Sequence, residues 1–457
     1  MSTQQAEWHQ ALIEKYNYAG PRYTSYPTAL SFQERFSEAD YLHAVEQYPE
    51  RDLSLYVHIP FCHQLCYFCG CNKQVTRQPQ KADRYLEALT LEIRQRAPMF
   101  QGRRVTQLHL GGGTPTFLTK NQLSRLIEQL RRQFSFSADI EMSIEIDPRE
   151  LASGMIEHLW LLGFTRLSIG IQDFDPAVQQ RINRIQDESS IEQLMREARS
   201  VGFRSVSFDL IYGLPLQTPE SFAATLAKVI SLAPDRLSVF NYAHLPELFA
   251  AQRKIKSHEL PSAGQKLVIL QQSIATLTAA GYCYIGMDHF ALPQDELAVA
   301  QREGRLHRNF QGYTTQGECD LLGLGVSAIS SLGESHAQNH KVLNTWYSCL
   351  ENQGSGLWRG VTLNDDDCLR RDVIKQLICH FRLDFSAIEA RWPIDFCRYF
   401  AEDLALLAPL AADGLVTLDD EGLKVTSAGR LLIRNICMCF DRYARRTAQL
   451  QQCSRVI

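Results

Sequence analysis

The sequence predicts an α/β fold: an incomplete (βα)6-type parallel barrel with an N-terminal arm and a mostly helical, winged-helix-like C-terminal domain. Strand and helix patterns alternate from residue 52 to about residue 290, which is the repeat of a parallel sheet. Polar side chains or glycines follow strand after strand, as they do at the active end of a βα barrel. The alternation ends near residue 363. We expect an arm at 1–50, the barrel at 51–290, a barrel-closing and connecting segment at 291–362, and the C-terminal domain at 363–457.

Seven stretches are the candidate strands: 52–59, 105–110, 140–146, 165–171, 204–211, 235–241 and 282–287. Helical patterns separate most of them, for instance at 81–96, 119–133, 191–201, 218–231 and 264–280. Six to seven such units predict an open barrel rather than a closed one of eight strands.

The arm contains Pro21-Arg-Tyr-Thr-Ser-Tyr-Pro-Thr28, and its two prolines argue against a regular helix. Two interpretations remain open. Chemistry alone favours a surface arm packed by its tyrosines. Alternatively, the arm folds over a site and Arg22 contacts a carboxylate there.

Four cysteines follow the first candidate strand. Cys62, Cys66 and Cys69 form a C-x3-C-x2-C run, and Cys71 comes two residues later. A short loop that brings three thiolates together is typical of a metal site, and thiolates suit iron–sulfur clusters or zinc. Three ligands to a four-iron cluster would leave one iron open to a chelating molecule.

Other interpretations of these cysteines are weaker. A disulfide framework does not fit a chain without a secretory signal whose remaining thiols are scattered singly. Zinc is the serious alternative, with Cys71 or His63 as a fourth ligand. Zinc ribbons usually pair two separated knuckles, however, and we find no second knuckle. Cys437 and Cys439 form only a C-x-C on a predicted helix or its end, where the side chains diverge.

The ends of the later strands predict a lined pocket. Gly111–Gly113 follow the second strand, and a bare glycine turn is the simpler interpretation of that run in isolation. Further polar or small groups come at or after successive strands, namely Thr114, Glu145, Gln172, Asp209 and Ala243. Arg184 would be a surface arginine by default, or would join Gln172 and Asp209 in a second polar sub-site. The segment 291–362 either closes the barrel edge or also brings Arg308 and Ile329 over the pocket.

Composition excludes several classes of function. The net charge is −4, from 47 basic and 51 acidic residues, which argues against a general nucleic-acid binder. No apolar run approaches the roughly 18–20 residues of a membrane span. The first residues lack the features of a signal peptide, so 13 cysteines imply a reducing compartment, and we expect a cytoplasmic monomer.

The cysteine spacing on the first strand-to-helix loop resembles the radical S-adenosylmethionine (SAM) superfamily. The remaining motifs narrow the match. PRYTSYPT, HIPFCHQLCYFCGCNK, GGGTPT, IEIDPRE, QDF followed by NRIQ, DLIYGLPLQT and HRNFQGYTT together resemble the oxygen-independent coproporphyrinogen III oxidase family over essentially the whole chain.

The resemblance implies oxidative decarboxylation of two propionates of coproporphyrinogen III to vinyl groups, giving protoporphyrinogen IX. It implies a 5′-deoxyadenosyl radical made from SAM at a [4Fe-4S] cluster, two bound SAM molecules, an electron donor for the cluster and a terminal electron acceptor. On the family pattern Cys62, Cys66 and Cys69 hold the cluster, whose fourth iron binds SAM. The first SAM would lie near Tyr56, Phe68, Gly112, Glu145 and Ile329, and the second near Gly113, Thr114, Gln172, Arg184, Asp209 and Ala243.

One residue role is a hypothesis, and two alternative functions remain beside the oxidase. Arg22 as a partner of substrate propionates is a hypothesis, made because a tetracarboxylate needs cationic contacts. A haem-binding chaperone of the same superfamily is the alternative from another class, and Cys71 and the PRYTSYPT arm favour the oxidase. The other alternative is a zinc-stabilised binding protein, which would be colourless and would not cleave SAM.

Overall fold

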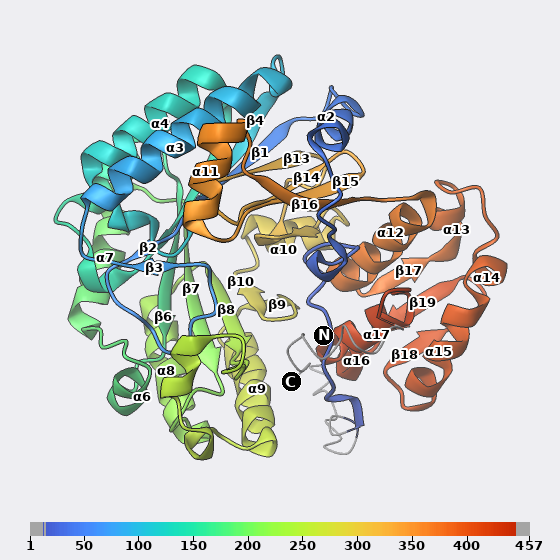
Figure 1. Cartoon of the computed structure of the whole chain (residues 1–457). Helices are drawn as coiled ribbons and strands as arrows, with labels where there is room; N and C mark the ends of the chain where they lie inside the picture. Colours follow the sequence, from blue (N-terminus) through green and yellow to red (C-terminus); the bar gives the residue numbers. More distant parts are fainter. Residues whose placement is uncertain (1–11, 13–14, 445–457) are drawn as a thin grey trace. The chain divides into compact units, whose positions relative to one another are not determined.

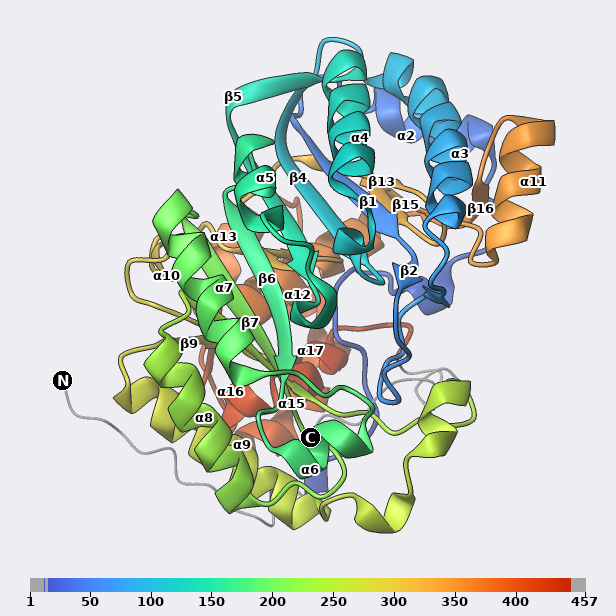
Figure 2. The same ribbon diagram turned by 90° about the vertical axis from the view of Figure 1, so that its left-hand side faces the viewer.

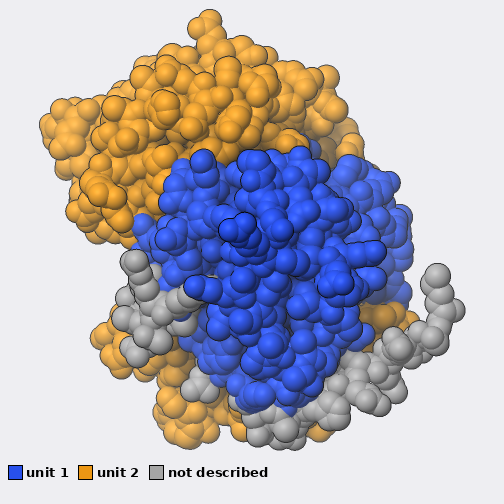
Figure 3. All heavy atoms as spheres, turned by 90° about the vertical axis from the view of Figure 1, so that its right-hand side faces the viewer, with its two compact units in different colours: residues 1–31, 281–317, 363–457 blue, residues 32–280, 318–362 orange. Residues whose placement is uncertain are grey.

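The computed structural model describes residue 12 and residues 15–444. The chain divides into two compact units, coloured separately in Figure 3. Unit 1 comprises 1–31, 281–317 and 363–457, and unit 2 comprises 32–280 and 318–362. All the predicted cluster and SAM residues belong to unit 2, whereas Arg22 and Arg308 belong to unit 1.

Six parallel strands form the centre of unit 2 (Figure 1), and they pair in chain order. They are β1 (Leu53–Ile59), β4 (Arg104–Gly112), β5 (Ser135–Ile146), β6 (Arg166–Gln172), β7 (Ser205–Tyr212) and β8 (Arg236–Asn241). The predicted α/β fold with six βα units is therefore confirmed. The third strand begins five residues earlier than predicted, because its first half is polar and the sequence pattern missed it.

Helices connect these strands and cover one face of the sheet, as Figure 2 shows for α3, α4, α7 and α8. The connecting helices are α3 (Gln80–Arg96), α4 (Lys120–Gln133), α5 (Met155–Leu161), α6 (Pro176–Arg181), α7 (Glu188–Val201), α8 (Pro219–Leu232) and α9 (Ala263–Ala279). Capping boxes set the starts of several of them; at α4 the Thr119 hydroxyl accepts from the Gln122 backbone N–H, and the Gln122 side chain accepts from the Thr119 N–H.

The alternation of side chains along β6 and β7 separates the core from the inner face of the sheet. Ile169 and Phe208 are fully buried. Their neighbours Ser168 and Asp209 point to the opposite side, because successive side chains of a strand face opposite ways, and both are only partly buried. The inner face of the sheet is thus lined by polar groups.

On the other side of β1 the chain adds four strands, β13 (Asp320–Leu324), β14 (Ile329–Leu332), β15 (Ser335–Asn339) and β16 (Leu357–Thr362). β13 pairs with β1 in parallel, and the other three follow as antiparallel neighbours. The close packing depends on Gly323, where an added Cβ would lie 2.4 Å from the Ile329 carbonyl oxygen. The remaining short elements of unit 2 are α2 (Glu38–Glu46), β2 (Phe61–Cys62), β3 (Gln74–Val75) and α11 (Leu343–Gln353).

The predicted strand at 282–287 forms, but it is not a seventh parallel unit. The segment forms β9 (Cys283–Gly286), which pairs antiparallel with β10 (His289–Ala291) in unit 1. Gly286 and Met287 have φ values of 141° and 53°, so the chain turns back at once. A parallel neighbour would need a longer crossover connection.

The carboxyl-terminal part of unit 1 is mostly helical with a small antiparallel sheet, as predicted. Its three strands are β17 (Arg382–Asp384), β18 (Val416–Leu418) and β19 (Gly422–Val425), in the order β17-β19-β18. The β18–β19 hairpin is the antiparallel pair at the end of this sheet. The helices of this region are α12 (Asp365–His380), α13 (Phe385–Glu389), α14 (Phe396–Tyr399), α15 (Ala401–Ala412), α16 (Ser427–Leu431) and α17 (Ile433–Cys439).

The N-terminal arm is fastened to this helical part of unit 1. Tyr16, Tyr23 and Tyr26 are each at most 5% exposed, which confirms the packing by tyrosines. The guanidinium of Arg434, on α17, donates to the carbonyls of Gly20 and Pro21. Unit 1 also contains α10 (Glu296–Arg302) and the β11–β12 pair (His307–Asn309 and Gly312–Thr314). Within the described residues of both units, no helix has the length and apolarity needed to cross a membrane.

We expect Gly323→Ala to lower the free energy of unfolding by about 1–3 kcal/mol, the usual cost of overpacking. The added methyl group would meet backbone at 2.4 Å, and backbone cannot move aside as a flexible side chain can. Urea unfolding followed by circular dichroism measures the change. Gly264→Ala in α9 is the matched control, because the nearest atom to its Cβ lies 3.9 Å away. Equal midpoints for the two variants would contradict the prediction.

Candidate active site

The cysteine loop leaves the carboxyl end of β1 and is held to the rest of unit 2 at several points. Tyr67 donates its backbone N–H to the Ile182 carbonyl at 3.0 Å. Three side chains donate to loop carbonyls: Asn183 to Leu65 at 2.7 Å, Gln252 to Phe68 at 2.9 Å and Lys73 to Cys69 at 2.8 Å. The loop is therefore positioned by its surroundings and not by its own sequence alone.

Apolar packing also holds the cysteine loop in place. Tyr67 and Phe68 pack against a buried cluster made of Val178, Ile182, Leu214, Tyr242 and Ile255. These residues come from segments after β6, β7 and β8, so the folding of the sheet creates the surface on which the loop rests.

Each of the three predicted cluster cysteines has a hydrogen-bond donor. Cys62 and Cys66 are 9% and 7% exposed. The Thr114 hydroxyl donates to Cys62 Sγ at 3.5 Å, and two guanidinium groups donate to Cys66 Sγ. The Cys71 thiol donates to Cys69. Donors to sulfur stabilise thiolates, which are the form that binds metal.

The surroundings affect Cys62 and Cys69 in opposite directions. Burial raises the pKa of Cys62 to about 12. The hydrogen bond from Cys71, with help from the positive charge of Lys73, lowers the pKa of Cys69 to about 6. Cys71, which sequence analysis left without a role, thus assists Cys69.

The donor set suits an iron–sulfur cluster. Three thiols come from one loop, and each has a hydrogen-bond donor at its sulfur. Cysteine thiolates with hydrogen bonds to their sulfurs are the usual ligands of iron–sulfur clusters.

The glycine turn has a packing role that the sequence did not indicate. A Cβ on Gly112 would lie 2.7 Å from the His58 ring, and a Cβ on Gly113 would lie 2.8 Å from the backbone of Pro60 and Phe61. These glycines therefore let β4 end directly against the start of the cysteine loop. The Gly112 N–H donates to Glu145 Oε2 at 3.0 Å, which directs this carboxylate toward the turn.

The residues predicted to surround the first SAM lie close to one another at the ends of β1, β4 and β5. The Tyr56 ring stacks on His109, and its hydroxyl contacts His58 Nδ1 at 3.0 Å. His109 Nε2 lies 3.5 Å from Glu145. Sequence analysis missed both histidines. Each lies two residues after a polar or aromatic side chain of the same strand, His58 after Tyr56 on β1 and His109 after Gln107 on β4, and therefore faces the same side of the sheet.

Two other members of this set come from distant segments. Tyr56 pairs with Gly323 in the β1–β13 register, and Gly323 abuts the Ile329 backbone, so Ile329 lies beside the same strand. Phe68 is connected to Ala243 through the side chain of Gln252, which is 2% exposed. The Gln252 amide donates to the Phe68 carbonyl and, at 3.1 Å, to the Ala243 carbonyl. Gln252 therefore connects one residue of each predicted SAM site, and sequence analysis did not single it out.

Three residues predicted for the second SAM gather around Gly170 on β6. A Cβ there would lie 2.8 Å from both the Arg184 guanidinium and the Gln172 amide. Asp209 is the register partner of Gly170 on β7 and accepts from the Ser168 hydroxyl at 3.0 Å. Burial and the nearby charge of Glu145 raise the pKa of Asp209 to about 6.

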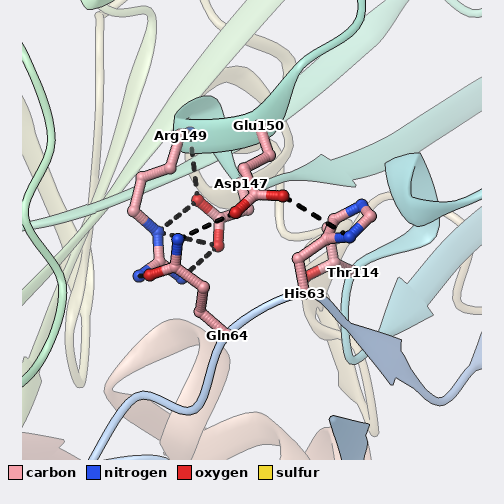
Figure 4. Close-up of a pocket in the computed structure, with 6 residues that line it drawn as sticks. All are labelled: His63, Gln64, Thr114, Asp147, Arg149 and Glu150. Atoms are coloured by element: carbon pink, nitrogen blue, oxygen red, sulfur yellow. Dashed lines mark hydrogen bonds and ion pairs between the residues drawn. The ribbon is translucent and has the colours of Figure 1, made fainter. Parts of the chain in front are cut away.

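A small pocket opens beside the cysteine loop and is drawn in Figure 4. It is lined by His63, Gln64, Thr114, Asp147, Arg149 and Glu150. The figure shows the Asp147 carboxylate facing the Arg149 guanidinium, with Gln64 and His63 reaching Glu150. Arg184 and Arg149 outweigh the effect of burial and hold the pKa of Asp147 at about 2.

Arg22 lies in unit 1 and forms an ion pair with Asp288, while its backbone carbonyl accepts from Arg308. Its side chain is 32% exposed. Arg22 and Arg308 are therefore neighbours within unit 1.

Comparison with known proteins finds matches along the whole chain. Residues 56–229 match the radical SAM superfamily, and residues 363–432 match the HemN C-terminal domain. The chain is 65% identical, over all 457 residues of both proteins, to the oxygen-independent coproporphyrinogen III oxidases of Salmonella typhimurium and Escherichia coli K12. It belongs to the oxygen-independent coproporphyrinogen III oxidase family. The oxidase of Pseudomonas aeruginosa is 52% identical and covers 98% of this chain and 99% of its own.

A solved structure agrees with this membership. The coproporphyrinogen III oxidase (HemN) of Escherichia coli, described as a radical SAM enzyme, superposes with a TM-score of 0.93. It is 64% identical and covers 96% of this chain and all of its own. The fold predicted from sequence is thus the radical SAM fold, and the chain is an oxidoreductase of a family that uses an iron–sulfur cluster and SAM.

The raised pKa of Asp209 predicts a pH dependence of stability in the apoprotein. The folded-state pKa is about 6, above the value of about 3.9 in an unfolded chain, so the folded state binds the proton more tightly. This contribution is fully present below about pH 4 and is lost as the pH rises to about 6. Asp209→Asn should therefore gain melting temperature relative to the parent chain between pH 4.5 and 6.5. A constant difference between the two proteins across this range would contradict the prediction.

Proposed function

We propose that this chain catalyses the oxygen-independent oxidative decarboxylation of two propionates of coproporphyrinogen III to vinyl groups, giving protoporphyrinogen IX. The observation that supports this most strongly is 65% identity, without a missing segment, to oxidases named for this reaction. The residues of the candidate site agree in type with the proposal. Three thiols on one loop suit a [4Fe-4S] cluster, and the small pocket beside this loop is lined by polar side chains.

In this proposal Cys62, Cys66 and Cys69 hold the cluster and leave one iron for SAM. A bound, reduced cluster would supply the electron for reductive cleavage of SAM to the 5′-deoxyadenosyl radical, the species proposed to take a hydrogen from the propionate β-carbon. Loss of CO2 and of one electron to the terminal acceptor would then leave the vinyl group. The residues of the protein would bind SAM and orient it. Glu145 and the Gly112 turn would hold the polar end of the first SAM, with Tyr56, Phe68 and Ile329 around it.

A second SAM would lie against Gln172, Arg184 and Asp209, with Gly113, Thr114 and Ala243 completing its surroundings. The shared position of the first three around Gly170 supports a single polar sub-site. Arg184 supplies the positive charge there and Asp209 the negative charge, a combination suited to a zwitterionic amino-acid group.

The test is an anaerobic assay with reconstituted iron and sulfide, a reductant, SAM, coproporphyrinogen III and an electron acceptor. We expect 5′-deoxyadenosine to form together with the stepwise loss of two carboxyl groups from the tetrapyrrole. Single Ser variants of Cys62, Cys66 and Cys69 should lose both products, by at least about 100-fold. Cys349→Ser is the control, since this thiol lies on α11, away from the loop. A full cluster with unchanged tetrapyrrole in the parent protein would contradict the proposal.

We further propose that Arg22 contacts a substrate propionate. Its positive charge is neutralised by Asp288, and the ion pair is partly open to solvent, so a carboxylate could exchange for Asp288. Arg22→Ala should raise the KM for coproporphyrinogen III about tenfold with little change in SAM binding. Asp288→Asn, which leaves Arg22 without its carboxylate partner, should not raise the KM. Unchanged turnover and substrate affinity in Arg22→Ala would remove the assignment.

A further inference from the structure

Arg149 is a buried cation beside the cysteine loop that the proposed reaction does not use. It stands two residues after Asp147, where the chain leaves β5 in a short 3-10 turn, Pro148–Glu150. Its side chain is only 6% exposed, although arginine is rarely buried unless paired. Its guanidinium N–H groups point at both the Asp147 carboxylate and the Cys66 sulfur.

The guanidinium is held in one orientation by several contacts. Nε donates to Asp147 Oδ1 at 2.9 Å and Nη2 donates to Oδ2 at 2.5 Å, a two-point contact that fixes the plane of the group. Nη1 donates to the Asn183 carbonyl at 3.2 Å. With these contacts satisfied, Nη2 also reaches Cys66 Sγ at 3.3 Å.

Cys66 differs from Cys62 in the charge of its donors. Arg184 Nη1 donates to the same Cys66 sulfur at 3.4 Å and to Asp147 Oδ2 at 3.2 Å. Two cations and one carboxylate therefore surround Cys66 and leave a net positive charge next to its sulfur. Cys62 receives only a neutral hydroxyl, from Thr114. Hydrogen bonds and positive charge at a ligand sulfur stabilise a cluster most when it carries the extra electron.

We infer that Arg149 is a positioning residue that acts through Cys66 to raise the reduction potential of the cluster and so favours its reduction. This inference rests on the proposed function, because it takes Cys66 to be a cluster ligand. Asp147 has the supporting role of holding the guanidinium plane. The neutral donor to Cys62 and the two cationic donors to Cys66 then make one side of the cluster site more electropositive than the other.

The test is the midpoint potential of the reconstituted full-length protein, measured by redox titration with electron paramagnetic resonance detection. We expect Arg149→Gln to shift the midpoint potential to more negative values by about 59 mV. For one electron this corresponds to about a tenfold increase in the ratio of oxidised to reduced cluster at a given potential. Arg149→Lys, which keeps the charge but loses the two-point contact, should show a smaller shift. Arg132→Gln is the control, because this arginine on α4 is exposed and pairs with Glu128 of the same helix.

Iron and sulfide content and SAM affinity are measured on the same samples. A potential equal to that of the parent protein, in whichever Arg149 variant retains a full cluster, would overturn the inference. So would loss of the cluster from both Arg149 variants while the parent and Arg132→Gln retain it, since Arg149 would then serve assembly and not the potential. If the parent protein itself forms no cluster, the proposed function fails instead.

Discussion

The parallel pairing of β1 with β4 is the constraint on which the rest of the site depends. In this register His58 and Ile59 lie beside Gly111 and Gly112. The pairing continues past the strands, because Gly113 donates to the Ile59 carbonyl at 2.8 Å and Thr114 to the Phe61 carbonyl at 2.8 Å. The cysteine loop and the glycine turn are thereby joined by backbone hydrogen bonds, and Thr114 is brought to Cys62.

Charge is distributed unevenly over the inner face of unit 2. Carboxylates are near one another where Glu145 raises the pKa of Asp209, whereas two guanidinium groups gather with Asp147 at Cys66. Like charges brought together away from water destabilise an empty site, and a ligand of opposite charge relieves them. The two regions suit the two needs of the proposed chemistry: a cationic ligand group at the carboxylates and an electron at the cysteines.

Periodicity predicted the elements well where it was strong. The six parallel strands and the helices between them have apolar spacing that only one secondary structure can bury on one face. At 282–287 it found the strand but not its direction, because a short apolar run is equally compatible with a parallel strand or a hairpin. The left-handed backbone at Met287 decides for the hairpin. It also missed the first half of β5, which is mostly exposed or half-buried and is joined to β4 by pairing at Ser135 and Phe136.

The sequence by itself determined the fold class and the family, and it predicts the three cluster cysteines, because all of these depend on residue types at fixed short spacings. Only the tertiary structure showed that the backbone of Pro60 and Phe61 leaves no space for a side chain at position 113. It also showed that Gln252 connects Phe68 with Ala243 and that Arg149 donates to Cys66. These contacts join residues up to 184 positions apart. Spacing along the chain carries no information about such pairs, since the sheet that brings them together forms only when all six strands are paired.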